Sequence, residues 1–248
     1  MKRLDGKVAL VTGASKGIGA AIAEALANEG ASVAINYHSD KASAEKLQKK
    51  IESAGGRAVI VGGNVADEKE AEQVVEEAVK AFSRLDIVVN NAGVYEFAPI
   101  ESVTAEHYNY QFNTNVLGLL QITKSALKYL TEGGSIINIG SGITEINPPA
   151  SVVYTATKAA VDSITKVLAK ELGGRKIRVN SINPGVTITE GLIKSGNLES
   201  DFVKTLIEQT PLGRSGAPED IAKAAVFLAS DESQWVTGDL ILATGGLY

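Results

Sequence analysis

The chain has 248 residues, of which 44% are hydrophobic and 21% are charged, and its formal net charge is −5. This length and composition fit one globular α/β domain, and the acidic balance argues against a nucleic-acid surface. Because cysteine is absent, disulfides and thiolate nucleophiles are excluded, and no window reaches the ~18 apolar residues of a membrane span. The histidines, His38 and His107, lack a metal-ligand spacing, and the first residues do not resemble a signal peptide. We therefore expect a cytoplasmic protein without a metal site or a membrane segment.

Short apolar runs rich in β-branched residues recur along the chain and predict strands. They lie at residues 8–11, 32–36, 58–61, 86–89, 135–139, 178–182 and 240–242. Segments with helical spacing separate them, which is typical of parallel strands joined by right-handed crossovers. The runs lack polar alternation, as expected when both faces of the sheet are covered. The sequence therefore predicts an α/β fold, a doubly wound parallel sheet of about seven strands with helices on both faces.

Local sequence signals predict where helices begin in both halves of the chain. Asp67 followed by Glu70 is a capping-box arrangement, and Pro218 suits the first turn of a helix. Residues 186–216 have no clear rhythm, and we expect a partly helical flap there. No linker or repeat divides the chain, so a single domain is expected to span residues 1–248.

The first predicted strand ends in a glycine-rich turn, residues 12–19 with the sequence TGASKGIG, and a helical pattern follows at once. Two chemistries use such a turn: backbone N–H groups that cradle a phosphate at a helix N-terminus, and a G-x-S-x-G elbow that presents a nucleophilic serine, here Ser15. An elbow serine needs an acid and then a histidine later in the chain, which would have to be His38 or His107. His38 closes the second predicted strand and His107 opens the helix after Thr104, and neither position is known to serve a serine elbow. A Walker A loop is also excluded, because Ile18-Gly19 stand where Gly-Lys is required. We therefore favour the phosphate cradle.

Four motifs in chain order carry a family resemblance. They are Thr12-Gly13-x-x-x-Gly17-x-Gly19, Asn90-Asn91-Ala92-Gly93, Tyr154-x-x-x-Lys158 and Asn183-Pro184-Gly185. A Tyr-x-x-x-Lys pair is weak alone, since residues 37–41 form a second copy. Together the motifs resemble those of the short-chain dehydrogenase/reductase (SDR) family over essentially the whole chain, close in appearance to 3-oxoacyl-[acyl-carrier-protein] reductase-like carbonyl reductases. The resemblance implies a Rossmann-type fold, hydride transfer with a nicotinamide cofactor, a substrate-binding role for the flap and a homotetramer.

The resemblance also implies four catalytic residues, Asn115, Ser141, Tyr154 and Lys158. Tyr154 and Lys158 are four apart on one predicted helix and share a face. An ammonium beside a phenol favours the phenolate, so we expect Lys158 to lower the pKa of Tyr154, which can then exchange a proton with a substrate oxygen. By resemblance, Lys158 also binds the nicotinamide ribose. Ser141 then holds the substrate oxygen, and Asn115 positions a water.

The implied cofactor contacts follow the carboxyl ends of several strands. They are Gly13, Ser15, Lys16, Gly17, Ile18, Gly19, Tyr37, His38, Ser39, Asn64, Val65, Asn91, Ala92, Gly93, Tyr154, Lys158, Pro184, Gly185, Thr187 and Thr189. NAD-preferring relatives carry an acid at the end of the second strand, where this chain has Tyr37. Lys16, His38 and Ser39 can bind a 2′-phosphate, so NADP(H) is favoured. Asp40, three residues after Tyr37, is an acid that can bind ribose hydroxyls, so NAD(H) stays an alternative cofactor.

We expect the substrate wall to be mostly apolar. Its proposed members are Tyr95, Ser141, Ile143, Glu145, Ile146, Tyr154 and Leu192, with Phe97 and Phe202 nearby. The charged candidates are acidic, whereas a carboxylate or phosphate substrate usually binds an arginine. An uncharged ketone or aldehyde, or the corresponding secondary alcohol, is therefore expected. The alternatives are a 3-oxoacyl-[acyl-carrier-protein] reductase, a glucose-type sugar 1-dehydrogenase and a non-catalytic NADP-binding regulatory protein.

Overall fold

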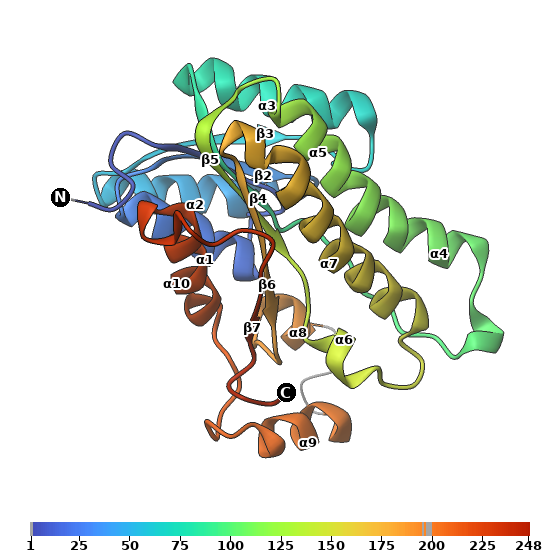
Figure 1. Ribbon diagram of the computed structural model, residues 1–248. Helices are drawn as coiled ribbons and strands as arrows, with labels where there is room; N and C mark the ends of the chain where they lie inside the picture. The colour runs from blue at the N-terminus through green and yellow to red at the C-terminus, as the bar shows by residue number, and fades with distance from the viewer. Residues whose placement is uncertain (1, 195, 197–199) are drawn as a thin grey trace.

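The computed structural model describes residues 2–194, 196 and 200–248, which contain one seven-stranded parallel sheet (Figure 1). The strands are β1 (Val8–Val11), β2 (Ser32–Tyr37), β3 (Arg57–Gly62), β4 (Leu85–Asn90), β5 (Leu130–Ile139), β6 (Arg178–Pro184) and β7 (Leu240–Ala243). Their order is β3-β2-β1-β4-β5-β6-β7, and every neighbouring pair is parallel. This confirms the Rossmann-type sheet, although β5 begins at Leu130 rather than at Ser135.

Helices cover both faces of the sheet (Figure 1). Helices α1 (Gly17–Asn28), α2 (Lys41–Ser53) and α10 (Pro218–Ala229) pack on one face, and α3 (Glu68–Phe82), α5 (Gly118–Ala126) and α7 (Val152–Leu172) on the other. Helix α4 (Ala105–Phe112) leads into α5 through a π-helical turn, Asn113–Leu117. The shorter helices are α6 (Ile143–Ile146), α8 (Glu190–Lys194) and α9 (Asp201–Gln209), with 3₁₀ turns at Ile100–Ser102, Gly173–Arg175 and Asp231–Ser233. The flap is therefore partly helical, as predicted.

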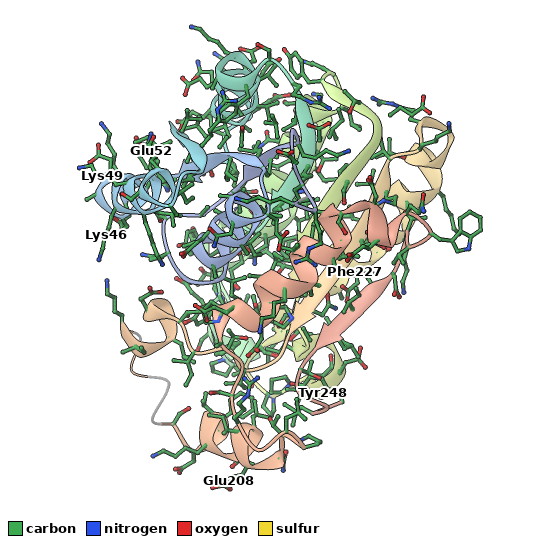
Figure 2. The ribbon with its side chains drawn as sticks, turned by 90° about the vertical axis from the view of Figure 1, so that its left-hand side faces the viewer. Lys46, Lys49, Glu52, Glu208, Phe227 and Tyr248 are labelled. Atoms are coloured by element: carbon green, nitrogen blue, oxygen red, sulfur yellow. The ribbon has the colours of Figure 1, made fainter. Side chains whose placement is uncertain are left out.

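Each face of the sheet buries its own apolar cluster. In β1, Leu10 packs among the side chains of α3 and α5, whereas Val11 packs on the side of α1 and α10. Consecutive strand residues point to opposite faces, and both faces are covered, so neither position tolerates a polar group. The outer side of α2 is solvated instead, and Lys46, Lys49 and Glu52 project from it (Figure 2).

The start of α3 differs in one detail from the predicted capping box. Asp67 caps the helix as expected, because its carboxylate accepts from the N–H groups of Lys69 and Glu70 at 2.9 and 3.0 Å. The Glu70 carboxylate, however, accepts from the N–H of Asn64 at 2.7 Å instead of reaching back to Asp67. This contact ties α3 to the segment that follows β3, which lies beside the site described below.

The sheet topology places a crevice at the carboxyl ends of the strands. Chain order runs outward from β1 to β3 and then from β4 to β7, so the direction reverses between β1 and β4. Ligands of open α/β sheets bind at such a switch point. Within the described part of the chain, no helix is both long and apolar enough to cross a bilayer.

Candidate active site

Two cavities meet at the carboxyl edge of the sheet. The first, here called the glycine-turn cavity, has a volume of about 590 Å³ and lies between residues 13–19, the ends of β2, β3 and β4, and the turn at residues 113–114. The second, the tyrosine cavity, has a volume of about 500 Å³ and is lined by Tyr154, the ends of β5 and β6, and the flap. They share the lining residues Ile18, Asn91, Gly93, Val94 and Thr189. A long ligand can therefore occupy both.

The glycine turn is shaped by backbone conformations that favour glycine. Gly13 and Gly17 both have φ +59°, and a Cβ on Gly13 would come within 2.8 Å of the Cα of Ala92. Asn36, which is buried in β2, accepts from the N–H of Gly13 at 3.1 Å and donates to the carbonyls of Val61 and Gly63. Sequence reasoning missed Asn36, although a lone amide inside an apolar strand was the available signal.

The glycine-turn cavity fits a pyrophosphate-bearing cofactor. The N–H of Gly17, at the start of α1, donates to a carboxylate oxygen of Glu190 at 3.0 Å. An anionic oxygen is thus already bound where unpaired N–H groups and the helix dipole attract phosphate. The predicted contacts from Gly13 to Gly19, together with His38, Ser39, Asn64, Val65, Asn91, Ala92 and Gly93, all line this cavity. Pro184, Gly185, Thr187 and Thr189 line the tyrosine cavity beside it.

The structure does not support the predicted cofactor contact of Tyr37, because this residue does not line either cavity. Side chains alternate along a strand, so Asn36 faces the glycine turn and Tyr37 points away from it. Its ring lies against Gly62, where an added Cβ would be 3.1 Å from the phenol oxygen. The cavity is bordered there by Asp40, whose carboxylate caps α2 through the N–H of Ser43 and lies 3.9 Å from Lys16 Nζ.

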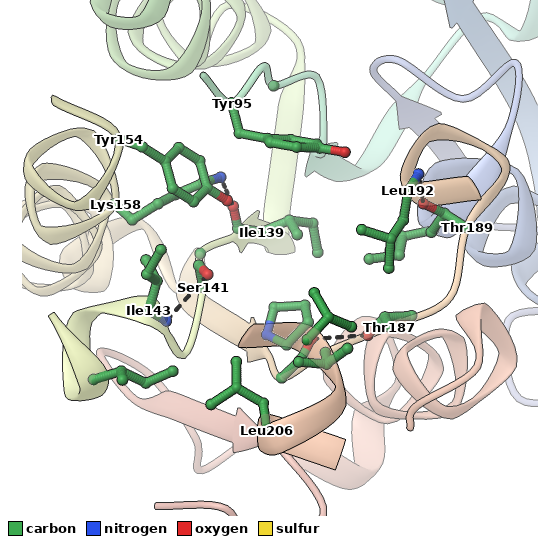
Figure 3. Close-up of a pocket in the computed structure, with 18 of the residues that line it drawn as sticks. Tyr95, Ile139, Ser141, Ile143, Tyr154, Lys158, Thr187, Thr189, Leu192 and Leu206 are labelled. Atoms are coloured by element: carbon green, nitrogen blue, oxygen red, sulfur yellow. Dashed lines mark hydrogen bonds between the residues drawn. The ribbon is translucent and has the colours of Figure 1, made fainter. Parts of the chain in front are cut away.

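Tyr154 and Lys158 project from α7 into the tyrosine cavity, opposite Ser141 at the end of β5 (Figure 3). Lys158 is 6% exposed and donates from Nζ to the carbonyl of Ile139 at 2.8 Å. Burial raises the pKa of Tyr154 to about 12, against the opposing effect of a hydrogen bond with Ser141. Burial also lowers the pKa of Lys158 to about 8, which the nearby Asp162 carboxylate opposes. The expected lowering of the phenol pKa by Lys158 is therefore wrong in this structure, because burial dominates the shift and only the hydrogen bond with Ser141 opposes it.

Asn115 lies apart from the tyrosine cavity. Its amide exchanges two hydrogen bonds with the backbone of Val94, both 2.8 Å, and donates to Thr157 Oγ1 at 3.0 Å. It also lines a separate cavity of about 10 Å³ together with Lys158. A polar cavity of that size is about the minimum for one water. The structure thus brings Asn115 close to Lys158, with its side chain engaged in holding the Val94 backbone.

The substrate wall agrees with the apolar expectation, with one correction. Of its proposed members, Tyr95, Ile143, Ile146 and Leu192 line the tyrosine cavity, whereas Glu145 does not. On α6, Ile143 and Ile146 are three apart and share the inner face, which leaves Glu145 exposed. Of the described lining residues, Lys158 alone carries a charged side chain.

Sequence reasoning missed further lining residues, among them Val186, Val203, Leu206 and Tyr248. The helical spacing of Val203 and Leu206 on α9 was an available signal. Tyr248 had none, because nothing local indicates that it packs near Gly142, where an added Cβ would lie 2.5 Å from its ring. Among residues 2–194, 196 and 200–248, no three His, Asp or Glu side chains are grouped to hold a metal ion.

Comparisons with known proteins agree with this geometry. A family model described as "Enoyl-(Acyl carrier protein) reductase" matches residues 13–248. An uncharacterized oxidoreductase of Methylorubrum extorquens is 55% identical over 100% of both chains, and a versicolorin reductase of Emericella nidulans is 36% identical over 99% of this chain and 97% of its own. A short chain dehydrogenase from Burkholderia cenocepacia, solved in complex with NADP, is 34% identical and superposes with a TM-score of 0.93 over 99% of each chain. The chain is therefore an oxidoreductase that belongs to the short-chain dehydrogenase/reductase family.

Proposed function

We propose that this protein is an NADP(H)-dependent carbonyl reductase, and in reverse an alcohol dehydrogenase, for an uncharged and mostly apolar ketone or aldehyde. The observation that carries the proposal is the junction of the two cavities. A phosphate-binding turn lies on one side of it, and Tyr154, Ser141 and Lys158 lie on the other. The apolar lining of the tyrosine cavity supports the substrate class.

When bound across the two cavities, a reduced nicotinamide dinucleotide supplies a hydride to the carbonyl carbon. Tyr154 donates its phenolic proton to the carbonyl oxygen, so that the C=O group becomes a C–H and an O–H. Ser141 hydrogen-bonds that oxygen and orients it. The Lys158 ammonium stabilises the phenolate that remains. With a pKa of about 12, Tyr154 carries its proton at neutral pH, which favours reduction over oxidation there.

The preference for NADP(H) is supported by the border of the glycine-turn cavity. His38 and Ser39 line it just after β2, and Lys16 lines it from the glycine turn, so that all three can reach a 2′-phosphate. The Asp40 carboxylate is engaged by the N–H of Ser43, which leaves it less able to bind ribose hydroxyls. The Burkholderia cenocepacia relative in complex with NADP agrees with this assignment.

Cofactor oxidation by the purified protein tests the proposal. NADPH and NADH are compared across a panel of aryl and alicyclic ketones, sugars and acyl thioesters. We expect ketone reduction with a higher kcat/KM for NADPH, and Tyr154→Phe lowers it at least ~10²-fold. Tyr108→Phe, an exposed tyrosine stacked on Phe112 at 4.2 Å, is the matched control. A clear preference for NADH, or for acyl thioesters or sugars over ketones, would refute the corresponding part.

A further inference from the structure

The segment at residues 94–98 carries the aromatic side of the tyrosine cavity. Tyr95 and Phe97 line the cavity, and their ring centroids lie 6.1 and 6.0 Å from that of Tyr154. The two rings are also 6.1 Å from each other. Both side chains are partly exposed, at 39% and 46%, so their faces are open to a bound molecule. Whatever holds this segment in place therefore shapes the surface that a substrate meets.

Two side-chain amides hold the segment as a neighbouring strand would. Asn115 exchanges a pair of hydrogen bonds with the N–H and C=O of Val94, both 2.8 Å. Gln111 does the same with Glu96, since its Oε1 accepts from the N–H at 3.2 Å and its Nε2 donates to the C=O at 3.1 Å. Such paired exchange is the pattern of an antiparallel ladder, in which only alternate residues bond to the same side. Tyr95, between the two clamped residues, is left free to face the cavity.

The helix and the extended segment have matching repeats. Four residues of an α-helix rise ~6 Å, and two residues of an extended chain rise ~6.6 Å. Gln111, on α4, and Asn115, in the π-helical turn, are four apart, and Val94 and Glu96 are two apart. Two amides one helical turn apart can therefore reach alternate residues of the segment. The next alternate residue, Ala98, is held by the carbonyl of Ala150 at 2.8 Å.

Gln111 is fully buried and its hydrogen-bonding groups are engaged. Besides the pair with Glu96, its Nε2 lies 2.7 Å from His107 Nε2, one turn earlier on α4, and the same ring nitrogen lies 3.3 Å from the carbonyl oxygen of Glu96. It does not line either of the two large cavities among the described residues. Asn115, in contrast, also bonds to Thr157 on α7 and is a proposed catalytic residue. Gln111 is thus the member of the pair whose side-chain hydrogen bonds are confined to the substrate segment and its own helix.

We propose that Gln111 is a specificity-determining positioning residue, which clamps the backbone of Glu96 and so holds Tyr95 and Phe97 against Tyr154. The inference rests on the proposed function, because it takes the tyrosine cavity as the ketone site. The substrates that depend on the clamp are ketones with an aromatic ring, which pack on these two side chains. Alicyclic ketones of smaller area depend on it less.

Two substitutions distinguish the loss of the Gln111–Glu96 hydrogen bonds from a general loss of protein stability. Gln111→Met has a similar length and removes both hydrogen bonds to Glu96. Ser135→Ala is the matched control, because Ser135 is also buried but donates to the carbonyl of Leu228, on α10 across the sheet. Gln111→Glu, which keeps the acceptor and loses the donor, is a second variant should Gln111→Met fail to fold. Melting temperatures are recorded for every variant.

Hydrogen exchange in the protein without substrate measures how firmly Gln111 holds the backbone of Glu96. We expect the Glu96 amide to exchange at least ~10-fold faster in Gln111→Met, as the loss of two net hydrogen bonds predicts. In Ser135→Ala its exchange rate should equal that of the wild type. In turnover, KM for the best aryl ketone of the panel rises ~10-fold with kcat within ~2-fold. KM for the best alicyclic ketone and the Kd for NADPH change less than ~2-fold. Destabilisation alone would not produce this split.

The outcomes are distinct. Unchanged Glu96 exchange overturns the clamp, and faster exchange with equal changes in KM for both kinds of ketone overturns the role in specificity. If the wild-type protein reduces no ketone, the proposed function fails, and with it the role in specificity. The exchange measurement still decides whether Gln111 holds the segment.

Discussion

Lys158 and Tyr154 show how burial, and not only proximity, sets the protonation of a site. Both side chains lie in the tyrosine cavity on one face of α7. Burial disfavours the charged form of each, so the pKa of Tyr154 rises to about 12 and that of Lys158 falls to about 8. At neutral pH the phenol is protonated and the lysine is mostly charged. The pair is therefore set for proton donation.

The pKa of Lys158 predicts the basic limb of the pH profile. Because the ammonium is lost as the pH rises through about 8, kcat/KM for ketone reduction should fall above that pH while Tyr154 is still protonated. The measurement is kcat/KM at saturating NADPH from about pH 6 to about pH 10. A profile that stays flat to the upper limit would contradict the assignment.

A substitution at Asp162 tests whether Lys158 causes this fall of kcat/KM at basic pH. Its carboxylate favours the charged form of Lys158, accepts from Asn183 Nδ2 at 3.0 Å, and lies one turn further along α7. Asp162→Asn should therefore move the limb to lower pH, since the favourable charge is gone and the burial of Lys158 remains. A limb at the wild-type position would show that another group titrates there.

At the scale of single elements, the flap and the glycine turn are joined by one contact. Glu190, the first residue of α8, accepts from the N–H of Gly17, so a cofactor phosphate must displace it. We predict that Glu190→Gln lowers the Kd for NADPH about threefold, as expected for an exposed charged contact. Titration by cofactor fluorescence measures this. Glu208→Gln, on the outer side of α9 (Figure 2), is the control. A higher Kd for NADPH in Glu190→Gln than in the wild type would refute the competition between Glu190 and the phosphate.

The start of α10 carries a carboxylate whose pKa links stability to pH. Hydrogen bonds from Arg214 and from the N–H of Ala217 lower the pKa of Asp220 to about 2, from 3.8. A depressed folded-state pKa stabilises the fold above the unfolded value, and this stabilisation is lost as the pH falls from about 4 to about 2.

The prediction is that Asp220→Asn lowers the melting temperature at neutral pH, and that the difference from the wild type shrinks across this acidic window. Thermal unfolding followed by circular dichroism measures both proteins. A difference that is constant down to about pH 2 would contradict the linkage.

For the whole molecule, the outer surfaces of the α5 and α7 layer bear on assembly. Leu120 on α5 and Val167 on α7 are exposed at 38% and 51%, and Leu117, in the π-helical turn that leads into α5, is exposed at 42%. Apolar side chains on one face of helices are typical of an interface, and symmetric pairing of such faces builds dimers and tetramers. We predict a homotetramer. Light scattering should give about four times the mass of the chain, Val167→Glu should reduce it, and a monomeric wild type would refute the prediction.

Local patterns predicted most of the architecture and much of the site. Strand runs, glycine positions and the spacing of Tyr154 and Lys158 depend on residues close in sequence, so the sheet, the glycine turn and the shared face of α7 could be predicted. Asp67 was correctly predicted to cap α3, because capping acts over three residues.

What only the tertiary structure decided depends on contacts between distant residues and on burial. The position of Tyr37 against a core cluster and away from the cavities, the exposure of Glu145 and the raised pKa of Tyr154 follow from what packs around each side chain. The amide pairs of Gln111 and Asn115 join a helix to a segment that precedes it by 15 and 21 residues. The sequence by itself therefore determined the family, the sheet and the glycine turn. Folding decided which side chains reach the cavities and how they are charged, because desolvation and long-range hydrogen bonds exist only in the packed chain.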